Sequence, residues 1–212
     1  HSDDPEAAAA AGADMAAEGA ALIDVGGEST RPGAKEVWEG DEIKRVVPVI
    51  ERLTRGGTLV SADTRKAGVM EAALAAGAHI VNDVSALLWD DRALEVVART
   101  QCPVVLMHAG DPKQGADGGH GYGDPLIEVY DWLEARIDAV VAAGVDRSRI
   151  IADPGIGFGK TLAHNLALLN GLALFHGLGV PLLLGASRKR IVGALSNEGP
   201  ADTRLGGWPA PA

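Results

Sequence analysis

Each of the six short apolar runs in this sequence ends in, or is followed at once by, a polar residue that could do chemistry. These residues are Asp24, Asp63, Asn82 with Asp83, His108, Asp153 and the group Ser187-Arg188-Lys189. Carboxylates select rings that bear an amidine-like pair of N–H groups, through paired charge-assisted hydrogen bonds. Asp and Asn also cap helices and close turns, but capping does not require one at the end of every run. The set therefore predicts one shared ligand site.

The elements that must position these residues follow from the hydrophobic pattern. Apolar runs alternate with helix-length amphipathic stretches, which is typical of repeated β–α units. We expect strands near Leu22–Gly26, Leu59–Asp63, Ile80–Asp83, Val104–His108, Ile150–Asp153 and Leu182–Gly185. We expect helices near Pro5–Glu18, Glu42–Arg55, Lys66–Ala75, Arg92–Arg99, Leu126–Ala143, Leu162–Leu169 and Lys189–Leu195. Six such strands fit an open doubly wound sheet or a (β/α)8 barrel, and both bring the carboxyl ends of the strands to one edge.

The first strand leads into the segment Asp24–Gly33, where an apolar run gives way to glycines, hydroxyls and an arginine. Gly26 and Gly27 let backbone or ligand approach closely where the strand stops. Thr30 and Arg31 can supply a hydroxyl group and a planar cation to an oxyanion or a carboxylate. This segment therefore predicts an anion-binding loop.

The segment Asp153–Thr161 has some of the letters of a phosphate-binding P-loop but not its spacing. Pro154 stands where the first glycine of that motif should be, so a nucleotide cradle is disfavoured. We expect instead that Asp153 accepts hydrogen bonds from a ligand, that the glycines let the ligand approach, and that Phe158 forms an apolar wall. Met107, with His108, is expected to line the same pocket.

The last apolar run places Gly185, Ser187 and Lys189 at the same rim. A Schiff-base lysine is one possibility in a barrel. The neighbouring Arg188 and Arg190 favour an anion-binding or hydrogen-bonding site instead.

Composition limits the classes of partner. The 212 residues, 47% hydrophobic, suffice for one well-buried core, and we expect one domain over residues 1–205 with an unstructured tail at 206–212. A net charge of −10 argues against nucleic-acid binding. No apolar run reaches the roughly 18 residues of a membrane span, and no basic segment followed by an apolar stretch resembles a signal peptide. We therefore expect a cytoplasmic protein without a membrane partner.

Five segments, in order, resemble the dihydropteroate synthases, the folate-pathway enzymes that join a pterin to p-aminobenzoate. They are Asp24–Gly33, Asp63–Lys66, Val81–Ser85, Asp153–Lys160 and Gly185–Arg190. Each motif is moderately specific, whereas the ordered set, within a match from about residue 3 to 205, is highly specific.

The resemblance implies a (β/α)8 TIM-barrel fold and a transferase that displaces pyrophosphate from a dihydropterin methyl diphosphate with the amine of p-aminobenzoate. It implies that Asp63, Asn82, Asp153 and Lys189 line the pterin pocket and that Thr30 contacts the diphosphate-bearing substrate. Met107 and Gly185 are further expected substrate-binding residues. It implies that Arg31, Pro32, Phe158 and Ser187 receive p-aminobenzoate, with Arg31 and Lys189 as the catalytic pair. Mg2+ as cofactor and a homodimer are further implications.

The resemblance departs from the family pattern at both ends. Members begin with a strand and loop of the type Asn-Val-Thr-Pro-Asp-Ser-Phe, whose asparagine binds magnesium, and finish with a strand carrying Arg-Val-His-Asp. This sequence starts after the first and leaves the pattern near Arg204–Gly207. We therefore expect a barrel incomplete at both ends, with about six strands, no metal ligand within the chain and impaired turnover. A methyltetrahydrofolate methyltransferase domain and a non-catalytic pterin-binding remnant are the alternatives.

Overall fold

Five parallel strands form a single sheet in the order β1-β2-β3-β4-β5. The computed structural model describes residues 4–30, 34–109 and 121–187. The strands are β1 (Ile23–Gly26), β2 (Val60–Asp63), β3 (Ile80–Asp83), β4 (Val104–Met107) and β5 (Ile150–Asp153). The helices are α1 (Pro5–Ala17), α2 (Glu39–Arg55), α3 (Ala67–Ala75), α4 (Ala93–Thr100), α5 (Pro125–Ala142) and α6 (Leu162–Asn170), with 3-10 turns η1 (Arg147–Arg149) and η2 (Leu172–Leu178).

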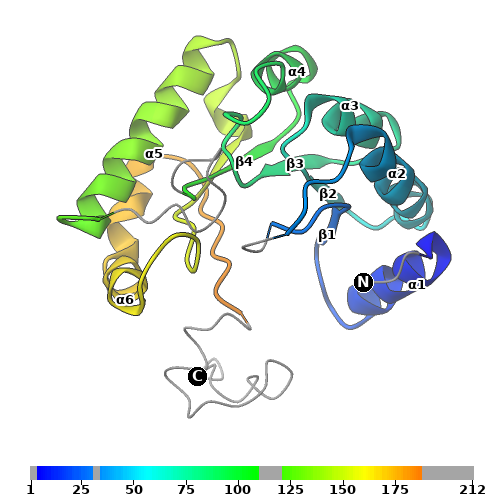
Figure 1. The fold of residues 1–212 in the computed structure, drawn as a ribbon, viewed down its shortest axis with the longest axis horizontal. Coiled ribbons are helices and arrows are strands. Elements are labelled where there is room, and N and C mark those ends of the chain that lie inside the picture. Colours follow the sequence, from blue (N-terminus) through cyan, green and yellow to red (C-terminus); the bar gives the residue numbers. More distant parts are fainter. Residues whose placement is uncertain (1–3, 31–33, 110–120, 188–212) are drawn as a thin grey trace.

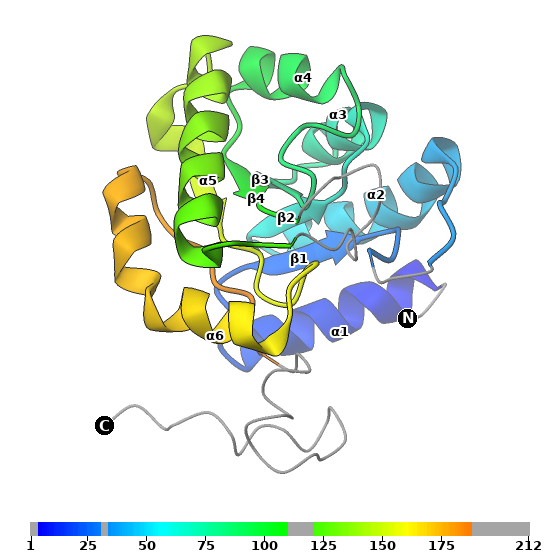
Figure 2. The same ribbon diagram turned by 60° about the vertical axis from the view of Figure 1, so that its left-hand side comes forward.

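The strand order decides between the two architectures that the pattern left open. A doubly wound sheet reverses its strand order at a switch point, whereas here each strand pairs with the next one along the chain. Right-handed crossovers then place every helix on the same side of the sheet. The helices lie around the outside of a curved sheet whose other face is turned inward (Figures 1 and 2). The fold is of the (β/α)8 TIM-barrel type.

The expected sixth strand, Leu182–Gly185, is not a strand. It makes a single parallel bridge between Ala152 and Leu182, held by hydrogen bonds from Ala152 to the Pro181 carbonyl and from Leu183 to the Ala152 carbonyl, each 2.9 Å. Proline has no N–H to donate, which limits the ladder on that side. The expected helix at Lys189–Leu195, the tail at 206–212 and residues 110–120, which include several glycines, lie outside the described residues.

The core lies between the sheet and the helices. Alternate strand residues, among them Val60, Val81, Val104, Leu106 and Ile150, are fully buried against the helices. Their neighbours along each strand must point the other way, into the barrel. The inner face carries the polar residues Asp24, Ser61, Asp63, Asn82 and Asp153 together with the apolar Ile80, Val105, Met107 and Ile151.

Candidate active site

The polar strand residues share the inner face of the barrel. In register, Asp24 pairs with Ser61, and Asp63 pairs with both Gly26 and Asn82. Asn82 pairs with Val105, two residues before Met107, and Met107 pairs with Asp153. Paired residues in parallel strands point to the same side, and side chains alternate along each strand. Asp63, Asn82, Met107 and Asp153 therefore face one space at the carboxyl ends of the strands.

Asp24 connects the first three strands by hydrogen bonds. Its Oδ1 accepts a hydrogen bond from Ser61 Oγ at 2.5 Å, and its Oδ2 accepts one from Asn82 Nδ2 at 3.1 Å. Burial raises the pKa of Asp24, and the two hydrogen bonds oppose that rise because they stabilise the ionised form. The bond to Asn82 also fixes its amide, so that the Asn82 carbonyl oxygen is the end left for a ligand.

Asp63 lies in the middle of this arrangement and is costly to ionise. Burial raises the pKa of Asp63 well above its usual value, and the negative charge of Asp24 raises it further. Within the described part of the chain, no side chain donates a hydrogen bond to its carboxyl group. A Cβ on Gly26 would lie 3.1 Å from Asp63 Oδ2, so glycine at that position leaves the space that the carboxyl group occupies. A ligand with N–H groups would supply the donors that Asp63 lacks.

The loop after β1 is fixed by a buried ion network. Lys66 Nζ lies 2.6 Å from both Glu28 Oε2 and Glu42 Oε2, and it also donates to the Val37 carbonyl at 2.7 Å. Arg65 pairs with the other oxygen of Glu28 at 2.7 Å. The network ties the loop that carries Thr30 to α2 and to the segment after β2. A loop fixed in this way can hold the Thr30 hydroxyl group in a defined place.

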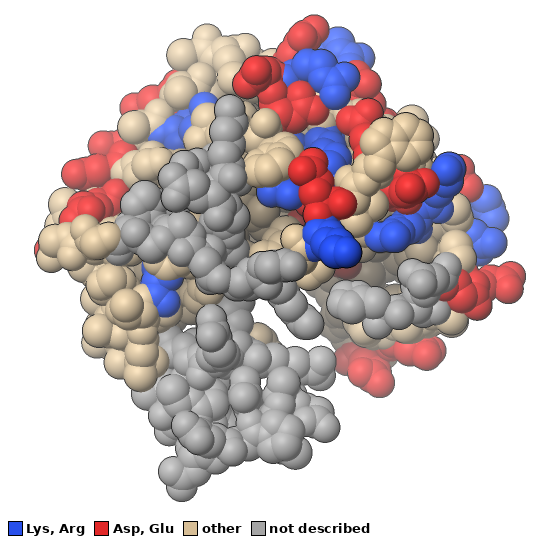
Figure 3. All heavy atoms as spheres, in the orientation of Figure 1, with Lys and Arg blue, Asp and Glu red and all other residues tan. Residues whose placement is uncertain are grey.

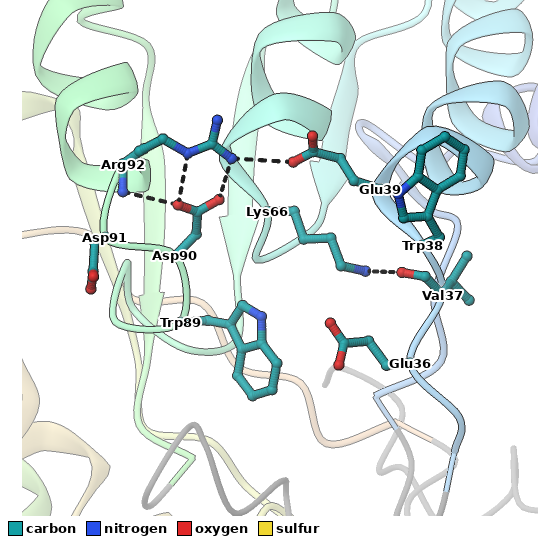
Figure 4. A pocket seen from close by; sticks show the side chains of 9 residues that line it. All are labelled: Glu36, Val37, Trp38, Glu39, Lys66, Trp89, Asp90, Asp91 and Arg92. Atoms are coloured by element: carbon teal, nitrogen blue, oxygen red, sulfur yellow. Dashed lines mark hydrogen bonds and ion pairs between the residues drawn. The ribbon is translucent and has the colours of Figure 1, made fainter.

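The far side of this network opens onto a cavity of about 600 Å³ between the start of α2 and the segment before α4. Figure 4 shows Lys66 reaching the Val37 carbonyl across it, and Arg92 joined to Asp90 and Glu39. On this face of the molecule, Lys and Arg side chains are interspersed with Asp and Glu side chains (Figure 3). The cavity lies at the outer rim and is lined by none of the residues predicted to bind substrate.

The loop between β5 and α6 places Asp153 and Phe158. Asp153, at the end of β5, accepts a hydrogen bond from Gly155 N at 2.7 Å. Phe158 is half-buried five residues further on. Asn165, buried on α6, accepts a hydrogen bond from Gly157 N at 2.7 Å and donates to the Thr161 carbonyl at 2.8 Å. The glycine-rich turn is therefore held from both ends.

Two of the polar strand-end residues have partners within the described part of the protein. Asp83 is fully buried and accepts hydrogen bonds from the backbone of Ser85 and Leu87, so it closes a turn. The ring of His108 packs edge-on against Trp132 of α5, with centroids 4.9 Å apart. His108 follows the end of β4, and its Nδ1 also lies 3.1 Å from Lys160 Nζ. The expectation that it lines the pocket with Met107 stays a prediction.

The other predicted site residues are placed as far as the structure describes them. Thr30 is half-buried at the end of the described part of its loop, Gly185 is half-buried and Ser187 is exposed. Arg31, Pro32 and Lys189 lie outside the described residues. The sequence interpretation missed Ser61 and Lys160. Ser61 could have been predicted, because it stands two residues before Asp63 in the same strand and therefore faces the same side. No sequence pattern predicts the contacts of Lys160.

Metal and membrane features can be stated only for residues 4–30, 34–109 and 121–187. There, no three His, Cys, Asp or Glu side chains come together in a way that could hold a metal ion. No described helix combines the length and the apolar composition of a bilayer span.

A parallel barrel with acids, an amide and a glycine-rich turn at its carboxyl edge matches one known class of proteins. The sequence profile of the family described as "Pterin binding enzyme" matches residues 1–208. The class that the fold and site define is that of the pterin-binding enzymes.

Individual relatives narrow this class. The chain is 44% identical over 194 residues to the dihydropteroate synthase of Bacillus subtilis and 48% identical over 197 residues to that of Mycobacterium leprae. These alignments cover 91% of this chain and 66% and 68% of the relatives, so the chain spans about two thirds of their length. It belongs to the dihydropteroate synthase family.

Solved structures agree in fold. A dihydropteroate synthase of Xanthomonas albilineans with 4-aminobenzoic acid superposes with a TM-score of 0.89 at 48% identity, over 96% of this chain and 72% of that one. The same organism's enzyme in complex with 7,8-dihydropteroate gives a TM-score of 0.85 at 45% identity, over 96% and 74% of the two chains.

Proposed function

We propose that this chain binds a dihydropterin in the barrel interior and catalyses dihydropteroate synthesis. The reaction joins 7,8-dihydropterin-6-ylmethyl diphosphate to p-aminobenzoate and releases pyrophosphate. The observation that carries the proposal is the shared inner face of Asp63, Asn82 and Asp153. Membership of the dihydropteroate synthase family and the ligands named for the Xanthomonas albilineans structures support the same reaction.

Recognition of the pterin follows from the donors and acceptors at this face. Asp153 accepts hydrogen bonds from the amidine-like N–H pair of the ring, and Asp63 accepts from a further ring N–H group. Asn82 has its NH2 group bound to Asp24 and offers its carbonyl oxygen. Met107 and Phe158 cover the ring faces, and Gly185 and Lys189 complete the pocket.

The chemical step is a displacement at the methylene carbon of the pterin. The amine nitrogen of p-aminobenzoate forms a bond to this carbon, the C–O bond to the diphosphate breaks, and pyrophosphate leaves with the electron pair. The amine then loses its proton. Thr30 contacts the diphosphate, and Arg31 and Lys189 stabilise the charges of the two substrates, while Ser187 binds the p-aminobenzoate. Catalysis is then positioning and charge stabilisation rather than covalent chemistry.

Magnesium enters the proposal as part of the substrate. Among the described residues, no three His, Cys, Asp or Glu side chains come together in a way that fits a resident metal site. We therefore take Mg2+ to arrive bound to the diphosphate of the pterin substrate, where it offsets the charge of the leaving group. No step is assigned to a metal ion held by this chain.

Assembly and location are further parts of the proposal. We propose one pterin-binding domain over residues 1–205, a homodimer and a cytoplasmic location, since both substrates are charged, water-soluble molecules. The large apolar side chains exposed on α5, α6 and η2, namely Ile127, Leu162 and Leu174, support a second copy as their partner. Light scattering of the purified protein tests the dimer, and a monomeric mass contradicts it.

The experiment that tests the reaction supplies both substrates with Mg2+ and measures pyrophosphate together with dihydropteroate. Equal amounts of the two products are expected. Pterin binding without either product identifies a non-catalytic pterin-binding protein. Methyl transfer from methyltetrahydrofolate to a corrinoid, without pyrophosphate release, identifies the methyltransferase alternative.

A further inference from the structure

The ammonium group of Lys160 sits among backbone carbonyl oxygens at the carboxyl ends of β4 and β5. Lys160 Nζ donates to the carbonyl oxygens of His108 at 2.9 Å, Gly155 at 3.0 Å and Phe158 at 3.1 Å. The ring nitrogen Nδ1 of His108 lies 3.1 Å from the same atom. An ammonium group has three N–H donors, so these four acceptors share them.

Carbonyl oxygens that converge on one point repel each other unless a cation lies between them. Rings of carbonyl oxygens hold monovalent cations in this way in other proteins. A lysine ammonium is compact and has three donors that can rotate toward separate acceptors, whereas the guanidinium of arginine is planar and rigid. Lys160 therefore fills a place that otherwise calls for a small monovalent cation.

The three carbonyl groups belong to the two segments that shape the pterin site. His108 directly follows Met107 of β4, and Gly155 and Phe158 belong to the loop after Asp153. Gly155 also donates its N–H group to Asp153 Oδ1. The contact between the segments is tight, because a Cβ on Gly155 would lie 1.9 Å from the His108 carbonyl oxygen. Movement of the loop away from His108 would carry Phe158 with it and would withdraw the Gly155 N–H group from Asp153 Oδ1.

We propose that Lys160 is a positioning residue for pterin binding, whose ammonium group locks the β5–α6 loop onto the end of β4. The proposal rests on the pterin site proposed above. Lys160 itself does not touch the pterin. Its loss lets the three carbonyl groups separate, so that the Asp153 carboxylate loses the hydrogen bond from Gly155 N and is no longer held toward the N–H pair of the ring.

The first test removes the cation and keeps most of the length of the side chain. Lys160→Met is compared with Lys44→Met, the same change at an exposed lysine whose only ion pair is with Asp41 in the described structure. Calorimetry with a dihydropterin should show an affinity at least roughly tenfold weaker for Lys160→Met and an unchanged affinity for Lys44→Met. Both variants should retain the circular dichroism spectrum of the wild type. Wild-type affinity in Lys160→Met would overturn the proposal.

The second test restores the cation from solution. Lys160→Ala lacks three carbons and the ammonium group, which n-propylammonium supplies as a separate molecule. Added n-propylammonium should recover most of the lost pterin affinity, whereas propyltrimethylammonium, which has the same charge but no N–H donor, should not. Equal rescue by both ions, or rescue by neither, would overturn the proposal, even if Lys160→Met fails to fold. Absence of pterin binding by the wild type would instead refute the pterin site itself.

Discussion

Asp24 on β1 accepts a hydrogen bond from the Asn82 side chain on β3, at 3.1 Å, although β2 lies between their strands. The bond spans β2, whose Ser61 and Asp63 share the same inner face and pair in register with Asp24 and Asn82. Asp24 thus orients the amide of Asn82, one proposed pterin-binding residue, while its charge disfavours ionisation of Asp63, another proposed pterin-binding residue. The affinity for the pterin and its pH dependence should both depend on Asp24.

Replacement of Asp24 by asparagine should shift the pH dependence of pterin binding to lower pH. Burial and then the charge of Asp24 raise the pKa of Asp63. Donors on the pterin favour the ionised form of Asp63, so affinity falls when acid protonates it. Without the charge of Asp24, the pKa of Asp63 moves back toward its usual value and the loss of affinity occurs at a lower pH. Calorimetry across a pH series measures this shift.

The control for this experiment is Asp14→Asn on α1, which removes one acid outside the site. Its pH profile should superpose on that of the wild type. A profile for Asp24→Asn that also superposes on the wild type would show that Asp24 does not govern the ionisation of Asp63.

Lys66→Met should destabilise the fold strongly. The Lys66 ammonium neutralises Glu28 and Glu42, whose side chains are 6% and 1% exposed. Removal of one partner of a buried ion pair costs about 3–5 kcal/mol, whereas Lys44→Met at an exposed pair should cost no more than about 1 kcal/mol. Urea denaturation measures both. Equal free energies of unfolding for the two variants would refute a structural role of the network.

The same network predicts the sign of a pH effect. Hydrogen bonds and charges from Lys66, Val37 and Arg65 outweigh burial and lower the pKa of Glu28. A lowered pKa in the folded state means that this stabilisation is present above the pKa of the unfolded state and is lost as the pH falls through the folded value. The difference in unfolding free energy between wild type and Glu28→Gln should therefore shrink in acid. A difference that stays constant with pH would contradict this assignment.

A comparison of Gly155→Ala with Gly144→Ala distinguishes the destabilisation caused by a steric clash from that caused by backbone strain. Both glycines have positive φ, +68° and +100°, but only Gly155 would bring its Cβ against another atom, the His108 carbonyl oxygen at 1.9 Å. Positive φ costs a non-glycine residue about 1 kcal/mol or more, and overpacking typically adds about 1–3 kcal/mol. Thermal and urea unfolding should show the larger loss for Gly155→Ala. Equal losses would mean that the contact with His108 relaxes freely.

The hydrophobic pattern predicted the six α-helices that the structure describes and five of the six expected strands, because apolar runs and amphipathic stretches report burial directly. The sixth expected strand, Leu182–Gly185, has the apolar composition of a strand but only one bridge to β5, and pairing depends on a partner that composition does not reveal. Sequential strand order, which makes the sheet a barrel, is likewise a property of tertiary packing.

The site was predictable where residue type and strand position coincide, as for Asp63 and Asp153. It was not predictable where a role depends on contacts between distant segments. Lys160 donates a hydrogen bond to the carbonyl of His108, 52 residues away. Every residue has a backbone carbonyl, so the sequence does not indicate which carbonyls will meet a given lysine. Asn82 and Asp83 stand side by side in the chain, yet the alternation of a strand turns the first into the barrel and the second into the core.

Calorimetric titration of the wild type and of Asp153→Asn with a dihydropterin tests the central claim most directly. In the proposed complex the N–H pair of the ring meets the buried carboxylate of Asp153, and the amide of the variant can accept only one of the two hydrogen bonds. A loss of about 2 kcal/mol or more is expected, which is roughly a 30-fold weaker affinity. Equal affinities for the wild type and Asp153→Asn, with both proteins folded, would contradict the assignment of the barrel interior as the pterin site.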